Sequence, residues 1–428
     1  MLSTFFIRFS FEMGWLRSKK KNKKPTESEI LANKRGTKLL EELIECYDGK
    51  SNPIKFFSTD EILNATNSFS GSNRLSELDG YGCYHWTDWY SGKNENHPRI
   101  LVKKLYRYAD GTFIRDIAVS SMVSGHNNFM KLVGCCLQSK NPVMVYDGVK
   151  KHYQIDIRRE TWKRRMKIAE DIATALAYLH TAFPRPFVYR SICRENILVD
   201  EDGVAKLTDF SYCVSIPQGE TFVQVEKVAG INGYMDDKYM RNRLVSEETD
   251  IFAIGILMLK FLTGKEILWI YDDDEEVEAE DEGYDDDNNS YHSAAMSDIN
   301  DLRRQFSEET ESEEEGEAVG EEDNHDDSGT MLRPANPSFF KQFKFIEERR
   351  MDEVTDQEML EKMGEISEEE LSQMEAFKML SLRCVGHKGE IPTMVEVTNE
   401  LKKIQNISSS PIGETTQFNS PQDVSSSS

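Results

Sequence analysis

Apolar residues recur at helical spacing over residues 161–180, where Trp162, Met166, Leu176 and Leu179 fall on one face of a helix. Most other positions of this segment are charged or small. The pattern predicts an amphipathic helix whose apolar face packs into a core.

A second segment, residues 251–259, is apolar on every side and predicts a buried central helix. It is far shorter than the roughly 20 residues that a membrane span requires, so we expect no transmembrane helix. Residues 75–147 show alternating strands with one helix, whereas residues 335–405 predict helices that include residues 375–382 and 394–403. These elements predict an α+β protein with a β-rich first part and a helical second part.

An acidic segment interrupts the helical part. Residues 272–327 contain 26 Asp and Glu against two Arg, which accounts for the whole formal net charge of −24 and leaves 50 basic and 50 acidic residues elsewhere. Low hydrophobicity and dense charge predict a disordered insert over residues 271–334, either a solvating spacer or a partner-binding segment. The Ser-rich residues 406–428 predict a disordered tail. Because the rest of the chain is neutral, charge gives no reason to expect nucleic-acid binding.

The cysteines favour a reducing compartment. Their number is odd, their spacing is irregular and no C-x-x-C pair occurs, which argues against disulfides and against a cysteine metal site. The seven are Cys46, Cys83, Cys135, Cys136, Cys193, Cys213 and Cys384.

The N-terminal segment carries a candidate membrane anchor. Starting at Met13, the chain fits the myristoylation pattern M-G-x-x-x-[ST], with Gly14 as the acceptor, and five lysines follow within residues 19–24. One acyl chain together with a polybasic patch binds the cytosolic face of a membrane. If translation starts at Met1 instead, Gly14 is internal and the segment is a solvated basic tail, so the sequence predicts a cytoplasmic protein with peripheral membrane association as an alternative.

Residues 185–211 resemble the catalytic loop and Asp-Phe-Gly motif of a protein kinase. In that motif an Asp accepts the proton of the substrate hydroxyl, while an Asn and the Asp of Asp-Phe-Gly hold magnesium. Here Asn196 and Asp209 remain as the metal candidates, but Ser191 replaces the base in a Tyr-Arg-Ser tripeptide and Cys193 replaces a nearby Lys. Losing a general base costs about 10²–10⁴ in rate, so the resemblance implies a pseudokinase with a bilobal protein-kinase fold.

The nucleotide side of the motif is partly kept. Residues 100–103 resemble the Val-Ala-Ile-Lys strand, so Lys103 is the candidate ligand of the α and β phosphates and Asp116 takes the place of its Glu partner. Asp is one methylene shorter than Glu, so we expect the ion pair only if the helix lies closer. Retention of Lys103 and Asp209 as structural ion-pair members is equally consistent with the sequence.

The glycine-rich loop is degraded. The frame G-x-G-x-x-G falls on Glu77, Asp79 and Gly82, with Gly80 between the last two. Carboxylates at glycine positions prevent a close backbone approach to phosphate and repel it. We therefore expect weak or absent Mg-ATP binding, with Gly80 and Gly82 as the remaining candidates of this loop.

Two further departures are coupled. Kinases of this kind carry a buried Glu after the activation segment that pairs with an Arg near the end of the domain, and here Lys238 and Ile391 replace the two partners. Removing both partners of a buried pair is close to neutral, whereas removing one is costly. Ser211 also replaces the Gly of Asp-Phe-Gly, which narrows the backbone freedom of that hinge.

The chain resembles the plant ZED-related kinases, a group of receptor-like cytoplasmic pseudokinases close to wall-associated kinases. The resemblance rests on residues 36–44 (Gly-Thr-Lys-Leu-Leu-Glu-Glu-Leu-Ile), on the lead-in at residues 56–70, and on Ser-Ile-Pro-x-Gly-Glu-Thr within residues 214–221. It implies an immune adaptor that links a coiled-coil NLR receptor to bacterial effectors or to effector-modified receptor-like cytoplasmic kinases. The acidic insert departs from the family pattern.

Two functions therefore remain open. The first is a catalytically inactive adaptor, and the second is a weakly active Ser/Thr kinase that uses Lys103, Asn196 and Asp209 with Mg-ATP; nucleotide binding that only stabilises the fold is an intermediate case. The expected organisation is a basic segment and lead-in helix (1–55), a kinase small lobe (56–147), a first part of the large lobe (148–270), the acidic insert (271–334), the last part of the large lobe (335–405) and the tail (406–428).

Overall fold

The structure of the protein is a computed structural model. It divides into two units, Met1–Trp269 with Pro334–Ser428 and Ile270–Arg333, and every element below belongs to the first unit. The expectations for Gly14, Asp79, the acidic insert and the tail after residue 407 lie outside the described residues. The structure describes residues 25–47, 54–78, 80–82, 85–94, 97–106, 110–231, 233–265 and 338–407.

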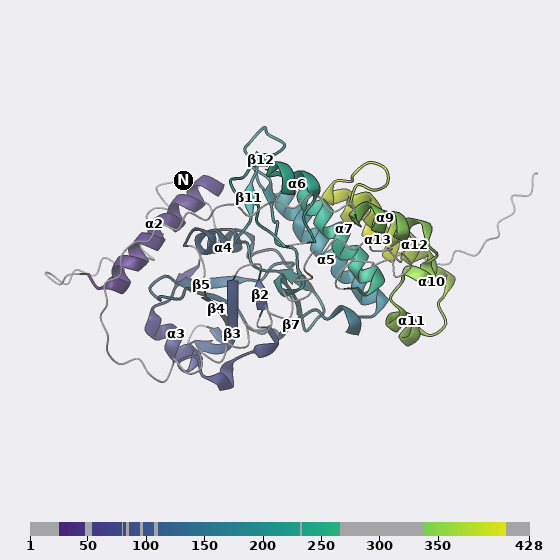
Figure 1. The fold of residues 1–428 in the computed structure, drawn as a ribbon. Coiled ribbons are helices and arrows are strands. Elements are labelled where there is room, and N and C mark those ends of the chain that lie inside the picture. Colours follow the sequence, from purple (N-terminus) through teal and green to yellow (C-terminus); the bar gives the residue numbers. More distant parts are fainter. Residues whose placement is uncertain are drawn as a thin grey trace, which may run out of the picture. The chain divides into compact units, whose positions relative to one another are not determined.

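A six-stranded sheet with the order β1-β5-β6-β4-β3-β2 forms the first part (Figure 1). Only β1 and β5 are parallel; the other neighbours are antiparallel. Three helices pack with this sheet, which confirms the predicted β-rich lobe. The strands are β1 (Lys55–Phe56), β2 (Gly80–Gly82), β3 (His85–Asn94), β4 (His97–Tyr106), β5 (Leu132–Cys136) and β6 (Val143–Asp147), and the helices are α2 (Glu27–Tyr47), α3 (Thr59–Thr66) and α4 (Asp110–Val123).

Alternation along β4 places its side chains in two cores. Ile100 and Val102 belong to a cluster with Ile62 of α3, whereas Leu101 and Leu105 belong to a cluster that includes residues of α2 and α4. This period of two is what a strand covered on both faces requires. Lys103 shares the parity of Leu101, so its side chain is directed to the α4 side.

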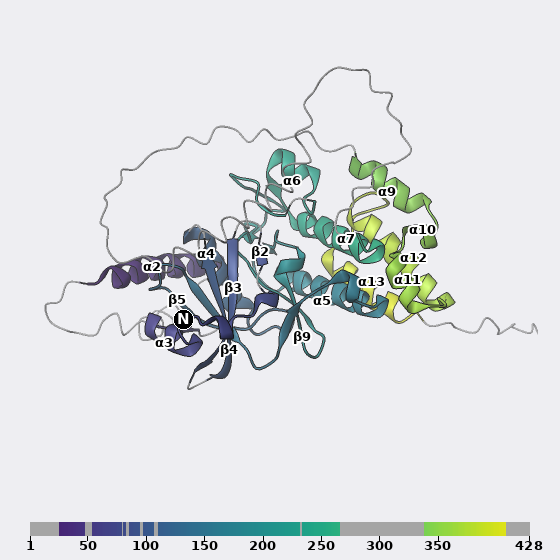
Figure 2. The ribbon, with the colours of Figure 1, turned by 60° about the horizontal axis from the view of Figure 1, so that its bottom comes forward.

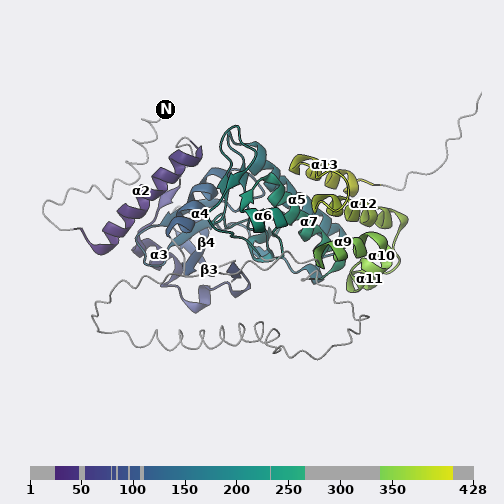
Figure 3. The ribbon, with the colours of Figure 1, turned by 45° about the horizontal axis from the view of Figure 1, so that its top comes forward.

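Helix α2 is a built-in part of the small lobe and lies beside α4 (Figure 3). Its Ala32, Leu39 and Leu43 are buried in the same core as the sheet. Arg35 is 2% exposed and its guanidinium donates hydrogen bonds to three carbonyls of the β5–β6 turn. The expected lobe boundary at residue 56 therefore leaves out a helix that the small-lobe core contains.

Helices α5, α7, α12 (Glu368–Cys384) and α13 (Met394–Gln405) pack against one another in the second part (Figure 2). Helix α5 (Trp162–Thr181) confirms the helix expected from apolar spacing, and α7 (Glu247–Thr263) confirms the buried central helix. At Gly255 of α7 an added Cβ would lie 2.7 Å from the Cβ of Cys384, so glycine permits the close approach of α12. The other helices are α6 (Asp237–Asn242), α9 (Ser338–Glu348), α10 (Met351–Val354) and α11 (Gln357–Met363).

Short strands position the loops between the two parts. A three-stranded sheet has the order β10-β9-β7, and two-stranded pairs join β8 to β11 and β12 to β13. No described helix is long and apolar enough to cross a membrane. The strands are β7 (His152–Gln154), β8 (Phe187–Val188), β9 (Ile197–Asp200), β10 (Ala205–Leu207), β11 (Val214–Ser215), β12 (Val223–Gln224) and β13 (Leu244–Val245).

Candidate active site

A buried carboxylate on α7 holds the loop that follows β8. Asp250 accepts hydrogen bonds from the backbone N–H groups of Tyr189 and Arg190, at 2.7 and 2.9 Å, and lies 2.9 Å from Nε2 of His180. Arg190 has a φ of +64°, a left-handed conformation that needs such external support. Sequence reasoning missed Asp250; its signal is a carboxylate directly before the apolar residues of α7.

The base position of this loop is sealed. Ser191 is 0% exposed, and its hydroxyl has no hydrogen-bond partner in the described part of the chain. Its carbonyl accepts a hydrogen bond of 2.9 Å from the side-chain amide of Asn196, which lies in the 3₁₀ turn Arg194–Asn196. Cys193 is buried at 3% exposure and carries no positive charge. Neither side chain supplies a proton acceptor or a cation to a bound substrate.

The three charged residues predicted for the nucleotide side come together. Lys103 Nζ lies 3.6 Å from Oδ2 of Asp116 and 3.8 Å from Oδ2 of Asp209. The other carboxylate oxygen of Asp116 accepts hydrogen bonds from the Ser120 hydroxyl and the Phe210 N–H. The shorter Asp side chain thus keeps the pairing expected of this position.

Burial and charge act in opposite directions on this cluster. Burial alone would lower the pKa of Lys103, but the nearby carboxylates of Asp209 and Asp116 outweigh it and raise that pKa above its usual value. Burial raises the pKa of Asp116, and Lys103 only partly offsets the increase. One lysine therefore compensates two buried carboxylates, which makes it a structural counter-ion whether or not it also binds phosphate.

The oxygen donors of the site are of the kind magnesium prefers. Asp209 and Asn196 offer a carboxylate and an amide oxygen, and both residues are nearly buried. Asp209 has a φ of +65°, and its carboxylate also accepts a hydrogen bond from the Ser211 N–H at 3.2 Å. Among the described residues no group of three His, Cys, Asp or Glu could hold a metal. A metal here would depend on further oxygen ligands from a nucleotide.

The roof of the site is formed by the residues that stand at the glycine-rich frame. Glu77 lies in a 3₁₀ turn, Ser76–Leu78, whose last carbonyl accepts a hydrogen bond from Gln154 at 3.1 Å. Gly80 and Gly82 lie in β2 and pair with Thr87 and His85 of β3. The described residues of the expected frame thus lie in a turn and in a strand, and the exposed carboxylate of Glu77 stands where the motif has a glycine.

A buried apolar cluster connects that roof with the strands below it. Leu78 is 2% exposed and belongs to one buried cluster with Leu101 of β4 and Leu198 of β9. Because β9 belongs to the large lobe, this cluster contains residues of both lobes. Strand β2 also packs against the 3₁₀ turn that carries Asn196. The donor set therefore fits magnesium, whereas the carboxylate of Glu77 repels a triphosphate.

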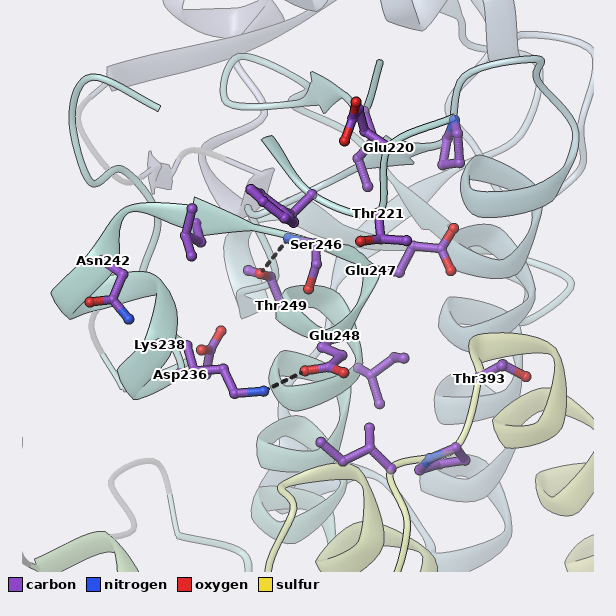
Figure 4. Close-up of a pocket in the computed structure, with 17 residues that line it drawn as sticks. Glu220, Thr221, Asp236, Lys238, Asn242, Ser246, Glu247, Glu248, Thr249 and Thr393 are labelled. Atoms are coloured by element: carbon purple, nitrogen blue, oxygen red, sulfur yellow. Dashed lines mark hydrogen bonds and ion pairs between the residues drawn. The ribbon is translucent and has the colours of Figure 1, made fainter. Parts of the chain in front are cut away.

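The two coupled departures lie around a surface pocket (Figure 4). Lys238 is exposed and forms an ion pair of 3.0 Å with Glu248, while Ile391 is 38% exposed. The paired replacement therefore leaves no buried unpaired charge at either position, as expected. The pocket holds about 510 Å³.

A protein-kinase fold with a buried hydroxyl at the base position defines a pseudokinase. Residues 90–314 match the family model described as protein kinase domain. A relative from Arabidopsis thaliana named as a probable inactive receptor-like protein kinase is 52% identical over 423 residues, covering 97% of this chain and 98% of the relative. The inactive serine/threonine-protein kinase ZRK12 of the same plant is 53% identical, covering 97% and 89%.

The non-functional pseudokinase ZED1, also from Arabidopsis thaliana, is 34% identical over 405 residues, covering 91% of this chain and 99% of the relative. These relatives span nearly the whole chain, including the part beyond the acidic segment. The chain belongs to the plant ZED-related kinases, a family of receptor-like cytoplasmic pseudokinases.

Proposed function

We propose that the protein is a catalytically inactive adaptor in plant immune signalling. It links a coiled-coil NLR receptor to bacterial effectors or to effector-modified receptor-like cytoplasmic kinases. The observation that supports this proposal best is Ser191, whose hydroxyl is fully buried inside a loop that Asp250 still holds in place. The chain keeps the fold of a kinase, which can present a binding surface, but it lacks the carboxylate that would act as the base in phosphoryl transfer.

An adaptor requires a stable surface and no transition-state stabilisation. The buried cluster of Lys103, Asp116 and Asp209 supports the surface by joining β4, α4 and the start of the activation segment. In this role the three residues are kept for folding. Mg-ATP binds weakly or not at all, and any magnesium that binds uses Asn196 and Asp209.

Membrane association is the second part of the proposal. Translation from Met13 exposes Gly14 for myristoylation, and the lysines of residues 19–24 supply the second signal for the cytosolic face of the plasma membrane. Intact-mass spectrometry of the protein from plant tissue tests it. A mass that includes one myristoyl group on Gly14 supports the anchor, whereas an unmodified chain that starts at Met1 rejects it.

Co-purification from plant tissue under immune challenge tests the adaptor function. We expect a coiled-coil NLR and a receptor-like cytoplasmic kinase to be recovered with the wild-type protein and, equally, with Ser191→Ala, because Ser191 takes no part in binding. Recovery of neither partner with a folded protein rejects the proposal. Loss of the partners in Ser191→Ala alone would show that the base position matters after all.

The retained Lys103, Asn196 and Asp209 support one alternative, a weakly active Ser/Thr kinase. A thermal-shift titration with Mg-ATP, followed by an autophosphorylation assay, separates the two functions. The comparison uses Lys103→Arg, which keeps the positive charge of the buried cluster. Phosphate incorporation that this variant abolishes favours the kinase, a thermal shift without turnover favours a structural nucleotide, and neither effect favours the adaptor.

A further inference from the structure

The pocket beside Lys238 is built from segments that are far apart in the sequence. Its walls come from the activation segment, the α6–α7 region and the turn before α13 (Figure 4). Apolar residues make up much of its lining. They are Pro186, Ile216, Phe222, Leu244, Ile251, Ile391 and Pro392.

Two of these apolar side chains are exposed to solvent. Phe222 is 47% exposed and Ile391 is 38% exposed, although they lie 169 positions apart in the chain. Single exposed apolar residues are ordinary, but two that line one concave surface provide a place for an apolar group of a partner. Ile216 and Ile251 are nearly buried in the same lining and supply its floor.

The polar part of the lining is acidic. It contains Glu220, Asp236, Glu247 and Glu248 against the single cation Lys238. Lys238 is paired with Glu248, and Asp236 caps α6 by accepting a hydrogen bond from the Tyr239 N–H.

Two carboxylates remain uncompensated. Glu220 is exposed in the activation segment, and Glu247 lies in the first turn of α7, where a carboxylate also interacts favourably with the helix dipole. Neither has a basic side-chain partner within the described residues. The pocket therefore repels phosphate and attracts a cation.

We propose that this pocket docks a segment of a partner protein in which an apolar side chain is flanked by Lys or Arg. The apolar side chain enters between Phe222 and Ile391, and the basic side chains pair with Glu220 and Glu247. The proposal rests on the adaptor function for its biological use, but its binding chemistry is tested on the purified protein alone. If peptides bind but no immune partner is recovered, the adaptor function is wrong and the docking site is supported. If immune partners are recovered but no peptide binds, the docking site is wrong and the adaptor function is supported.

The test begins with a selection of random phage-displayed peptides on the purified full-length chain. We expect enrichment of sequences with Leu, Ile or Phe beside Lys or Arg. A fluorescently labelled selected peptide is then titrated and followed by anisotropy. Raising the salt concentration weakens its binding because the exposed charges are screened.

Two pocket variants and a matched control locate the binding site. The double variant Glu220→Lys with Glu247→Lys replaces attraction by repulsion and lowers the affinity by at least about tenfold. The matched control Glu365→Lys with Glu368→Lys changes the charge equally at an exposed loop residue and at the first turn of α12, outside the pocket, and keeps the affinity within about twofold. Phe222→Ala removes an exposed side chain and weakens binding without the charge change.

Three results overturn the proposal. The first is an absence of enriched peptides on a folded wild-type chain. The second is enrichment of acidic peptides, or of peptides that bind the pocket variant as well as the control. The third is a wild-type dimer, measured by light scattering, that the Glu220→Lys with Glu247→Lys variant converts to a monomer, because the pocket would then be an interface between two copies of this chain.

Discussion

A buried hydroxyl without a hydrogen bond costs free energy, and Ser191 carries such a group. We predict that Ser191→Ala leaves the free energy of unfolding unchanged or raises it by about 1 kcal/mol. The contrast is Tyr189→Phe, which removes a hydroxyl that donates to the Thr208 carbonyl at 2.5 Å and should cost about 1 kcal/mol. Chemical denaturation of the two variants measures both effects. A loss above 1 kcal/mol in Ser191→Ala would reveal a partner for the hydroxyl.

Lys103 is the counter-ion of two buried carboxylates, so the loss of stability caused by its removal should depend on pH. We predict that Lys103→Met lowers the free energy of unfolding by about 3–5 kcal/mol near pH 8. The folded-state pKa of Asp116 is already raised by burial, and loss of the lysine raises it further. A protein becomes less stable as pH rises when a carboxyl group has a higher pKa in the folded state than in the unfolded state. The difference in the free energy of unfolding between wild type and Lys103→Met therefore shrinks toward pH 5.

Thermal melts of wild type and Lys103→Met across this pH range measure the difference. Lys93→Met is the matched control, because Lys93 is exposed and has no ion-pair partner in the described part of the chain. We expect its melting temperature to follow wild type at every pH. If the difference in melting temperature between wild type and Lys103→Met is constant from pH 5 to pH 8, the carboxyl groups of Asp116 and Asp209 do not titrate in this range, and the prediction is wrong.

The charged residues of the site could be predicted because their motif positions fix where the fold places them. Lys103, Asp116 and Asp209 meet as the spacing indicates. The roof could not be predicted in the same way. Whether the Glu77 region forms a loop or a 3₁₀ turn depends on Gln154 and on burial of Leu78, and both contacts join distant segments. The burial of Ser191 likewise follows from packing and has no signal in the tripeptide itself.

At the scale of elements, α2 shows how a helix outside the expected lobe becomes part of its core. We predict that Arg35→Ala lowers the free energy of unfolding by about 1.5–3 kcal/mol, because three carbonyls lose a charged donor. Amide hydrogen exchange should show faster exchange in α2 and at the β5–β6 turn. Lys34→Ala is the control, since Lys34 is exposed on the same helix. Equal effects of the two substitutions would mean that α2 is only loosely attached.

The apolar spacing predicted α5 to within one residue at each end, because its buried face repeats along its whole length. The central helix was predicted only over its apolar residues 251–259, and α7 extends four residues further at each end, where its first turn carries Glu247 and Glu248. The position of α2 is different because part of its attachment comes from Arg35, a charged residue that sequence patterns assign to solvent. The carbonyls that accept hydrogen bonds from Arg35 belong to the backbone, so they leave no mark on side-chain identity.

At the scale of the whole chain, one buried ion pair joins segments on the two sides of residues 266–337. Arg165 of α5 lies 2.5 Å from the carboxylate of Asp356, and it also donates to the Phe261 carbonyl near the end of α7. The N–H of Asp356 donates to the Leu262 carbonyl at 2.9 Å. The chain before the acidic insert and the chain after it are thus bound to each other by contacts that do not involve the insert.

This arrangement predicts that the insert is dispensable for folding. The sequence predicts that residues 271–334 are disordered, and shortening a disordered segment several-fold lowers the entropic cost of closing it by about 1 kcal/mol. Replacing these residues by a Gly-Ser linker should therefore leave the thermal melting temperature unchanged or raise it slightly. By contrast, Arg165→Ala should cost about 3–5 kcal/mol, since Asp356 would remain buried without its partner. Differential scanning calorimetry of both proteins compares the two effects. Unfolding caused by removal of the insert would show that these residues contribute to the core, and the predicted disordered spacer would then be wrong.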